Sequence, residues 1–362
     1  MNTSANMRLD ELIVGQGLAG SLLAWHLIEA GRRVAVIDDA DRDNASRVAA
    51  GLLNPLAGRR LRLPARLDPA LDASLTLWRR LERAFGQTFF HPLPMLRIFR
   101  DREQRRLFET LRHEPAYRAF LAGRADVNDA ILMPDGGFIQ SQTGWLDTTA
   151  LLDALRAWLV ERHALIETRC DSDEFVPRPD HVRWRERQAD RVIFCEGWHL
   201  RQNHWFDWLP LQPAKGDILD LETREQLPEH IINNGCWAIP ASAGRLRFGA
   251  SNRWRFDDSL PETAGRRWLE QQLARLFRHP ERFRVLAQRA GVRPGTADRQ
   301  PFIGHHPEFP RLLVFNGFGA RGTLFMPLHA DGLTRHLCRN APLPEDADIR
   351  RYHERYASHA PG

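Results

Sequence analysis

The chain has 362 residues, of which 43% are hydrophobic. That length can bury one large core or two modest ones, and two lobes is the better expectation. The 51 basic and 46 acidic residues leave a formal net charge of +5, and no basic block stands apart from the acidic residues. Such a diffuse charge does not indicate nucleic-acid binding, although a pI near 9.5 leaves it open.

The cysteines and the apolar runs indicate in which cellular compartment the protein is expected. Cys170, Cys195, Cys236 and Cys338 lie far apart in the sequence and form no CxxC pair. This spacing indicates neither a zinc site nor a disulfide framework, so we expect no metal and a reducing environment. The first ten residues lack the apolar core of a signal peptide, and no apolar run reaches the roughly 18 residues of a membrane-spanning helix. We therefore expect a cytoplasmic protein that makes no membrane contact.

The first pattern along the chain, over residues 11–39, is typical of a strand, a tight glycine turn, a helix and a second strand. We predict the strands at 12–14 and 34–37 and the helix at 21–30. Further helices are predicted at 72–85, 147–162, 263–277 and 326–338. Further strands are predicted at 191–195, 217–221, 245–250 and 311–315.

No repeat, low-complexity tract or Ser/Gly-rich linker divides the chain. Lobes joined without linkers usually mean that the chain passes between them several times, so we expect discontinuous domains. We predict a cofactor-binding domain from residues 1–85, 141–204 and 291–345. A second domain, with a mixed sheet, is predicted from residues 86–140 and 205–290. Residues 346–362, rich in proline and charge, are predicted to form a surface tail.

Three glycines in the first turn carry the clearest chemical signal. Gly15 permits the tight turn, Gly17 lets the backbone approach a pyrophosphate, and Gly20 lets the helix pack close to the strand. Asp38 ends the second strand, where a carboxylate can hydrogen-bond a ribose, with Asp39 as the alternative. The strand, turn, helix and acidic residue together predict dinucleotide binding. This motif alone leaves both NAD and FAD open.

Segments further along the chain favour FAD. Residues 46–55 resemble the second FAD-contacting loop of the D-amino-acid oxidase and glycine oxidase superfamily. Residues 291–304 and 316–322 resemble the closing signature of that superfamily, and residues 189–197 resemble its strand-end motif. The resemblance covers most of the chain, in the family's order.

The resemblance implies an α/β fold with a Rossmann-type, glutathione-reductase-like FAD-binding domain and a second, α+β mixed-sheet substrate domain. It also implies non-covalent FAD, since no cysteine lies where sarcosine oxidases attach a covalent flavin. The cofactor contacts implied by the motifs and the resemblance are Gly15, Gly17, Leu18, Ala19, Gly20, Asp38, Asp39, Arg47, Ala50, Gly51, Asn54, Gly197, Gly317, Gly319, Ala320, Arg321, Gly322 and Thr323.

Two arginines are candidate catalytic residues. Arg293 matches the position where glycine oxidase-like members hold the substrate carboxylate, a task that suits the planar guanidinium fork. Arg247 resembles the position of a lysine near flavin N5 in sarcosine oxidases, where a cation stabilises superoxide-like charge. In the family, the segment 319–323 begins a helix whose N-terminus faces the flavin pyrimidine ring, where negative charge develops.

The sequence also departs from the family pattern. Glu196 stands where a small residue is usual, and none of the three tyrosines lies where amino-acid oxidases orient their substrate. These departures do not favour oxidation of an ordinary D-amino acid. Lys215, the only lysine, occupies a stretch where relatives often carry an arginine, and its role is open.

Three hypotheses of function follow. The first is an FAD-dependent oxidase or dehydrogenase that removes a hydride from the carbon beside the nitrogen of a small amine or amino acid. Its electron acceptor is molecular oxygen or another carrier. The second is a flavin-dependent oxidase that acts on the side chain of a wobble uridine in tRNA. It is based on residues 319–322, which are similar to a segment of bacterial tRNA wobble-uridine modification enzymes. The third is a flavin-bound module that binds a partner without turnover.

Overall fold

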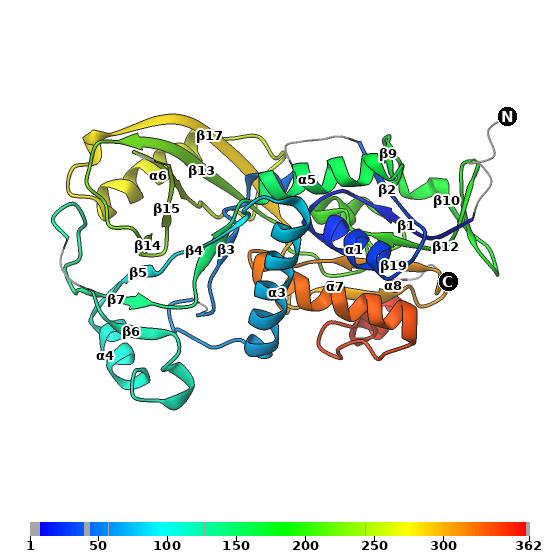
Figure 1. The fold of residues 1–362 in the computed structure, drawn as a ribbon, viewed down its shortest axis with the longest axis horizontal. Helices are drawn as coiled ribbons and strands as arrows, with labels where there is room; N and C mark the ends of the chain where they lie inside the picture. The colour runs from blue at the N-terminus through cyan, green and yellow to red at the C-terminus, as the bar shows by residue number, and fades with distance from the viewer. Residues whose placement is uncertain (1–7, 40–43, 57, 126–127, 243, 360–362) are drawn as a thin grey trace. The chain divides into compact units, whose positions relative to one another are not determined.

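The computed structural model describes residues 8–39, 44–56, 58–125, 128–242 and 244–359. These residues form two compact units (Figure 1). Unit 1 contains the described residues up to Arg47, residues 148–214 and residues 292–359. Unit 2 contains the described residues of 48–147 and 215–291.

Unit 1 is built on a sheet whose main strands run parallel in the order β19, β12, β1, β2 and β9. Two short strands, β10 and β11, continue the sheet antiparallel beyond β12, and β18 pairs antiparallel with β19. The bounds are β1 (Leu9–Val14), β2 (Val34–Asp38), β9 (Leu165–Glu167), β10 (Phe175–Pro177), β11 (Val182–Trp184), β12 (Arg187–Phe194), β18 (Phe302–His305) and β19 (Leu312–Asn316).

Helices cover this sheet because its strands are apolar on both faces. Ile13, Val36 and Ile193 are completely buried, as expected for parallel strands between helical layers. α1 packs against both α5 and α7. The helices of unit 1 are α1 (Leu18–Glu29), α2 (Ala45–Val48), α5 (Thr148–Glu161), α7 (Gly322–Arg339) and α8 (His353–His359), with short 3₁₀ helices at Ser172–Glu174, Gly197–Gln202 and Ile349–Tyr352.

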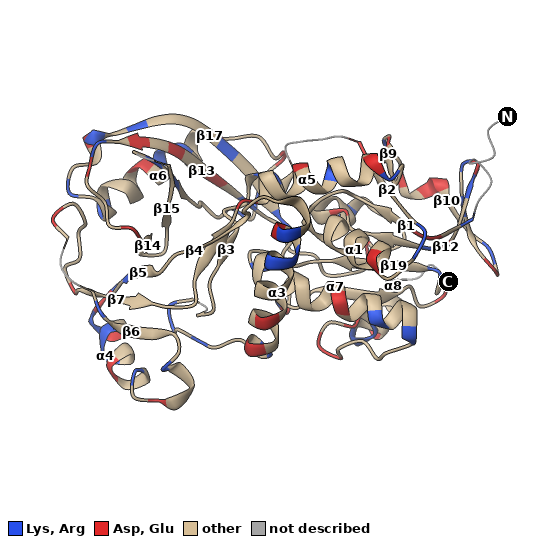
Figure 2. Cartoon of the chain, viewed as in Figure 1, with Lys and Arg blue, Asp and Glu red and all other residues tan. Residues whose placement is uncertain are grey.

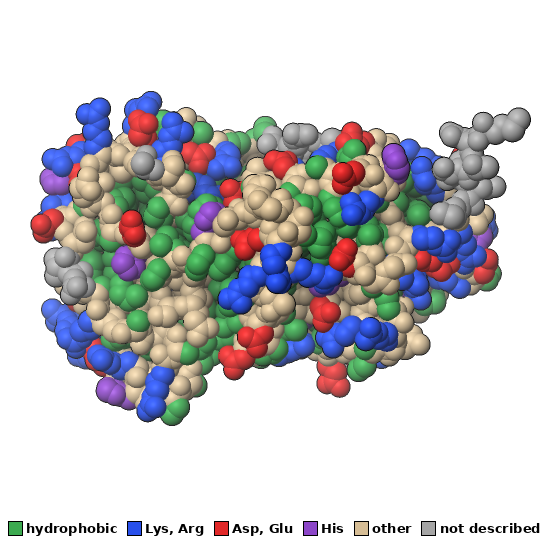
Figure 3. All heavy atoms as spheres, viewed as in Figure 1, with side chains coloured by type: hydrophobic (Ala, Val, Ile, Leu, Met, Phe, Trp, Pro, Cys, Tyr) green, Lys and Arg blue, Asp and Glu red, His purple; other side chains and the backbone are tan. Residues whose placement is uncertain are grey.

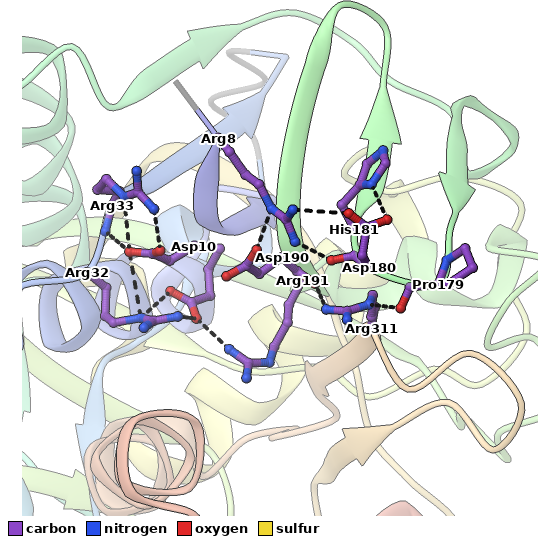
Figure 4. A network of polar contacts seen from close by, with 11 residues as sticks. Arg8, Asp10, Arg32, Arg33, Pro179, Asp180, His181, Asp190, Arg191 and Arg311 are labelled. Atoms are coloured by element: carbon purple, nitrogen blue, oxygen red, sulfur yellow. Dashed lines mark hydrogen bonds and ion pairs between the residues drawn. The ribbon is translucent and has the colours of Figure 1, made fainter. Parts of the chain in front are cut away.

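Ion pairs join the amino ends of the parallel strands (Figure 4). The Glu11 side chain on β1 is fully buried and accepts hydrogen bonds from Arg32 at 2.7 and 3.1 Å and from Arg191 at 3.1 Å. Asp10 pairs with Arg33 at 2.9 Å, and Arg8 pairs with Asp190. These contacts lie at the opposite end of β1 from the glycine turn.

Unit 2 contains a mixed sheet in the order β17, β13, β16, β15, β14, β5, β7 and β6, and a small antiparallel sheet in the order β3, β8 and β4. Leu269 and Leu273 of α6 pack into the apolar cluster on one face of the large sheet. The bounds are β3 (Leu52–Leu53), α3 (Leu67–Phe85), β4 (Phe90–Pro92), β5 (Met95–Ile98), α4 (Arg102–Leu111), β6 (Leu121–Arg124), β7 (Gly137–Gln140), β8 (Gly144–Leu146), β13 (Ala214–Thr223), β14 (Ile231–Asn233), β15 (Trp237–Ser242), β16 (Arg245–Gly249), α6 (Thr263–Leu276) and β17 (Phe283–Arg293).

The boundary between the units differs from the domain boundary expected from the sequence. Residues 48–85 and 141–147, which we placed in the cofactor domain, belong to unit 2 where they are described. Strand pairing is the reason, because β3 and β4 both pair with β8 in one antiparallel sheet. The strands at 52–53 and 144–146 therefore stay in the same unit.

The predicted surface tail is partly core. Ile349 is completely buried, and the backbone nitrogen of Ile303 donates to the carbonyl of Ala347 at 3.0 Å. Tyr352 and Tyr356 pack against the apolar cluster of unit 1. Residues 360–362 of that predicted tail lie outside the described residues.

Charges of both signs are interspersed along each unit (Figure 2) and lie beside one another on the face shown in Figure 3. Among the helices that the structure describes, none combines the length and the apolar character needed to cross a membrane. Within the described ranges, no group of three or more His, Cys, Asp or Glu side chains is placed to hold a metal ion.

Candidate cofactor site

The cofactor residues predicted in unit 1 gather at the carboxyl ends of its parallel strands. Gly15 follows β1, Asp38 ends β2, Gly197 lies shortly after β12, and Gly317 follows β19. Open parallel sheets bind their ligands at this edge. The side chain of Asn316 donates to the carbonyl of Gly197 at 2.7 Å and so joins the loops after β19 and β12.

A side chain would meet different surroundings at each of the three glycines of the turn. A Cβ atom on Gly15 would lie 2.7 Å from the carbonyl oxygen of Cys195, and one on Gly20 would lie 1.9 Å from that of Gly15. Both glycines are therefore required by the packing of the chain itself. A Cβ on Gly17 would meet only the Oγ of Ser46, at 3.4 Å. The packing of the chain therefore does not itself exclude a side chain at Gly17, unlike at Gly15 and Gly20.

Asp38 is held by two donors. Its Oδ1 accepts from the backbone nitrogen of Gln16 at 3.0 Å, and its Oδ2 pairs with Nη1 of Arg156 at 2.9 Å. The side chain of Asp38 is only 13% exposed, whereas Asp39 is an exposed residue. The carboxylate of Asp38 is therefore the better placed of the two for a ribose hydroxyl at the strand end.

The short helix α2 supports the start of α1. The backbone nitrogen of Leu18 donates to Oγ of Ser46 at 3.1 Å, and Leu18 and Ala19 are themselves buried. Arg47 is buried as well, and its Nη2 pairs with Asp153 of α5 at 2.8 Å. The predicted contact Arg47 thus has a carboxylate partner within the protein.

Glu196 brings a titratable group to the end of β12. Burial raises the pKa of its carboxyl group to about 7, although a hydrogen bond from Asn203 at 2.7 Å acts in the opposite direction. The next residue, Gly197, has a φ of 60°, which favours glycine. The departure from the family pattern at Glu196 therefore places an acid with a near-neutral pKa beside the glycine turn.

The start of α7 is electropositive. Gly319 donates from its backbone nitrogen to the carbonyl of Pro294 at 3.1 Å, and Arg321 donates through Nη2 to the carbonyl of Arg299 at 2.8 Å. Burial, together with the nearby charge of Arg299, lowers the pKa of Arg321. Among the other residues predicted here, Ala320 is exposed, Gly322 opens the helix and Thr323 is buried. The N-terminus of α7 and Arg321 together favour a negative charge at this point.

Arg293 is the last residue of β17; it is assigned to unit 1, whereas β17 up to Gly291 is assigned to unit 2. Its Nε lies 3.4 Å from the carbonyl oxygen of Ala214, and burial lowers the pKa of its guanidinium group. The next residues turn towards α7, since Pro294 is the residue whose carbonyl accepts from Gly319. Arg293 is therefore connected through Pro294 to the loop that precedes α7.

Four predicted site residues lie in unit 2. Gly51, with a φ of 64°, is required by close packing, because its Cβ would lie 1.9 Å from the carbonyl oxygen of Leu146. Asn54 accepts from Nε2 of Gln140 at 2.8 Å. The guanidinium of Arg247 stacks over the ring of Trp145 at 4.9 Å, and burial lowers its pKa. Ala50 packs against the same cluster as Trp145.

Four residues of the site were not singled out from the sequence. They are Gln16, Ser46, Arg156 and Asn316. Gln16 and Arg156 bond to Asp38, Ser46 bonds to the start of α1, and Asn316 bonds to Gly197. Gln16 stands inside the glycine motif, and Ser46 and Asn316 stand in segments that resemble the family, so their positions were available as signals. Arg156 had none, because arginine is too abundant in this chain to stand out.

Comparison with known proteins identifies the family. The family model described as "FAD dependent oxidoreductase" (DAO) matches residues 10–336. The chain belongs to this family. Glycine oxidase of Geobacillus kaustophilus is 25% identical over 350 residues, which cover 89% of this chain and 90% of that enzyme. The tRNA 5-methylaminomethyl-2-thiouridine biosynthesis bifunctional protein MnmC of Burkholderia pseudomallei is 29% identical over 331 residues, which cover 82% of this chain and 48% of that protein.

A solved structure confirms the predicted fold class of this DAO family member. The crystal structure of glycine oxidase from Geobacillus kaustophilus matches with a TM-score of 0.76 and 22% sequence identity, and the match covers 95% of this chain and 98% of that one. The fold is accordingly the DAO-like α/β fold, with an FAD-binding domain and a mixed-sheet substrate domain. The chain spans about half the length of the MnmC relative.

Proposed function

We propose that the chain is an FAD-dependent enzyme that oxidises the C–N bond of a small amine or amino acid by hydride transfer to flavin N5. The observation that carries this proposal is the turn at the end of β1, where the protein's own packing requires Gly15 and Gly20, whereas a Cβ on Gly17 would meet only the Ser46 hydroxyl, at 3.4 Å. The match to the DAO family over residues 10–336 supports FAD as the occupant.

The residues of unit 1 fit a non-covalent FAD. Gly17 gives the pyrophosphate room, Asp38 offers a carboxylate to the adenosine ribose, and the N-terminus of α7 offers backbone N–H groups to the pyrimidine ring. When bound, FAD would accept the hydride from the carbon beside the amine nitrogen, and water would hydrolyse the resulting imine.

Three arginines take part in the proposed chemistry. Arg293 pairs with the substrate carboxylate, and the charge of Arg321 and the positive end of α7 stabilise the negative charge that accompanies hydride transfer. The stack of Arg247 on Trp145 keeps a cation in a largely desolvated place. We propose that this cation favours reoxidation by oxygen, as the resemblance to sarcosine oxidases implies.

The experiment is an anaerobic titration of the purified protein that follows the flavin absorbance at about 450 nm. Glycine and N-substituted glycines are compared with the matching amines that lack the carboxylate. We expect the carboxylate-bearing compounds to bleach the flavin. Arg293→Ala should raise the concentration for half-maximal reduction on the order of 10²-fold for these compounds only, because a buried charge pair is lost.

Arg267→Ala, on the exposed surface of α6, is the matched control and should behave as the wild type. An equal effect of Arg293→Ala on amines with and without the carboxylate would contradict the role of Arg293. If the protein binds flavin but no amine reduces it, the proposed reaction is contradicted. That result would favour the hypothesis of a flavin-bound module that binds a partner.

The identity to the MnmC relative favours a second candidate, oxidation of an amine side chain on tRNA. This candidate requires binding of tRNA that weakens steeply as salt is added, because phosphate contacts release counterions. Binding of tRNA is measured at several salt concentrations. Salt-dependent binding together with flavin reduction by the modified nucleoside supports this candidate, and absence of tRNA binding rejects it.

A further inference from the structure

Arg156 of α5 bonds to three separate segments of unit 1. Its Nη1 donates to Oε1 of Gln16 at 3.1 Å and to Oδ2 of Asp38 at 2.9 Å, and its Nη2 donates to Oε1 of Glu167 at 2.8 Å. The side chain of Arg156 is only 10% exposed. One guanidinium therefore connects the glycine turn, the end of β2 and the end of β9.

The bonds among Arg156, Gln16 and Asp38 form a closed ring. The backbone nitrogen of Gln16 donates to Oδ1 of Asp38, Oδ2 of Asp38 accepts from Arg156, and Arg156 donates back to the Gln16 side chain. Nε2 of Gln16 also donates to Oγ of Ser21 at 2.9 Å. Both oxygens of Asp38 are thus oriented by the protein itself, so the ribose ligand does not have to order that side chain.

The same face of α5 also holds α2. Oγ1 of Thr149 donates to the carbonyl of Arg47 at 3.1 Å, and Oδ1 of Asp153 pairs with Nη2 of Arg47 at 2.8 Å. Positions 149, 153 and 156 are spaced by four and three residues, which places them on one helix face. This face of α5 therefore supports both the glycine turn and the helix whose Ser46 hydroxyl accepts from Leu18.

The two carboxylate partners of Arg156 differ in surroundings. Glu167 is 58% exposed, and an exposed ion pair stabilises a protein little. Asp38 is 13% exposed, so its pair with Arg156 is largely shielded from water. The contact that matters is therefore the one to the carboxylate that we assign to the adenosine ribose.

We propose that Arg156 is a positioning residue for the cofactor, which acts by fixing Asp38 and Gln16 in the geometry that binds FAD. This inference rests on the proposed function, because it takes the turn at Gly15 as the FAD site. Arg156 itself does not touch the cofactor in this proposal. Its effect is on the affinity for FAD.

The test measures the dissociation constant of FAD by titrating the apoprotein, together with the urea unfolding of that apoprotein. Arg156→Lys keeps the charge but loses the planar fork that reaches Gln16, Asp38 and Glu167 together. We expect its FAD dissociation constant to rise about tenfold or more, because a charged hydrogen bond that orients Asp38 is lost. Arg162→Lys, at the exposed residue that directly follows the same helix, is the matched control and should bind FAD as the wild type does.

A double-mutant cycle separates positioning from a merely structural role. If Arg156 acts through Asp38, the effect of Arg156→Lys on FAD affinity should largely disappear in the Asp38→Asn background. Gln16→Leu opens the ring while leaving the Arg156–Asp38 pair, so it should weaken FAD binding even if Arg156→Lys does not fold.

Each outcome has one meaning. Weaker FAD binding by Arg156→Lys that is lost in the Asp38→Asn background supports the inference. An unchanged FAD dissociation constant in a folded Arg156→Lys protein, or an effect that persists in full in the Asp38→Asn background, overturns it. Wild-type protein that takes up no FAD overturns the proposed function itself.

Discussion

Glu196 is the residue of the candidate site whose charge changes near neutral pH. Its carboxyl group has an ordinary pKa of 4.5, and burial raises it to about 7 in the folded chain. A raised pKa means that the folded state binds the proton more tightly than the unfolded state. The stability that this group contributes is therefore complete below pH 4.5 and is lost as the pH rises to about 7.

Glu196→Gln should remove this dependence, because the amide resembles the protonated acid in shape and never ionises. We expect the free energy of unfolding of the wild type to fall between pH 5 and pH 7 relative to that of the variant, which should be the more stable protein at pH 8. Urea unfolding of both apoproteins at several pH values measures this. Parallel stability curves for the two proteins would contradict the prediction.

Single residues were predictable where backbone geometry restricts the residue type. Gly15 and Gly20 follow from their spacing in the first βαβ unit, since a side chain at either glycine would meet a carbonyl oxygen. The role of Asp38 as the ribose ligand stays a prediction. Arg156 was not predictable, because its contacts join segments more than a hundred residues apart. The sequence left the role of Lys215 open; the structure shows a buried side chain paired with Asp258 and Glu262.

The proposed FAD site depends on the glycine turn. We expect substitutions at its second and third glycines to have different effects on FAD binding and on stability. Gly17 has a φ of −75°, which alanine adopts readily, so Gly17→Ala should fold with unchanged stability but lose FAD because its methyl group occupies the phosphate space. Gly20→Ala should lower the stability itself by about 1–3 kcal/mol, because its Cβ meets the Gly15 carbonyl.

Urea unfolding and FAD titration of the apoproteins measure both effects. Glu11→Gln is a useful control, since it disturbs the buried ion pairs at the far end of β1 and should change stability without changing the intrinsic FAD affinity. Gly17→Ala protein that binds FAD as tightly as the wild type would show that the turn is not the cofactor site.

Elements with a strong local pattern were predicted well. The helices at 147–162 and 263–277 lie within about one residue of α5 (Thr148–Glu161) and α6 (Thr263–Leu276), because apolar residues recur there at helical spacing. The strand β17 (Phe283–Arg293) was missed. Several of its residues are exposed or charged, so the apolar alternation that would indicate a strand is broken.

The sequence predicts that the chain forms two discontinuous domains, but it does not predict their boundaries. The discontinuous arrangement was expected, but residues 48–85 were expected in the cofactor domain and lie in unit 2 where described. The register of β3 against β8 joins residues about ninety positions apart, and no local pattern encodes such a pairing. The buried contacts of Ile349 likewise follow from β18, which the sequence did not indicate as a strand.

The central claim, a dissociable FAD in unit 1 that serves a redox reaction, is tested most directly by the flavin content of the full-length protein. The absorbance at about 450 nm is measured for the protein and then for the supernatant after acid precipitation. The released cofactor is identified by chromatography. We predict one FAD per chain, recovered entirely in the supernatant. A colourless protein that takes up no FAD, or flavin that stays with the precipitate, would contradict the account.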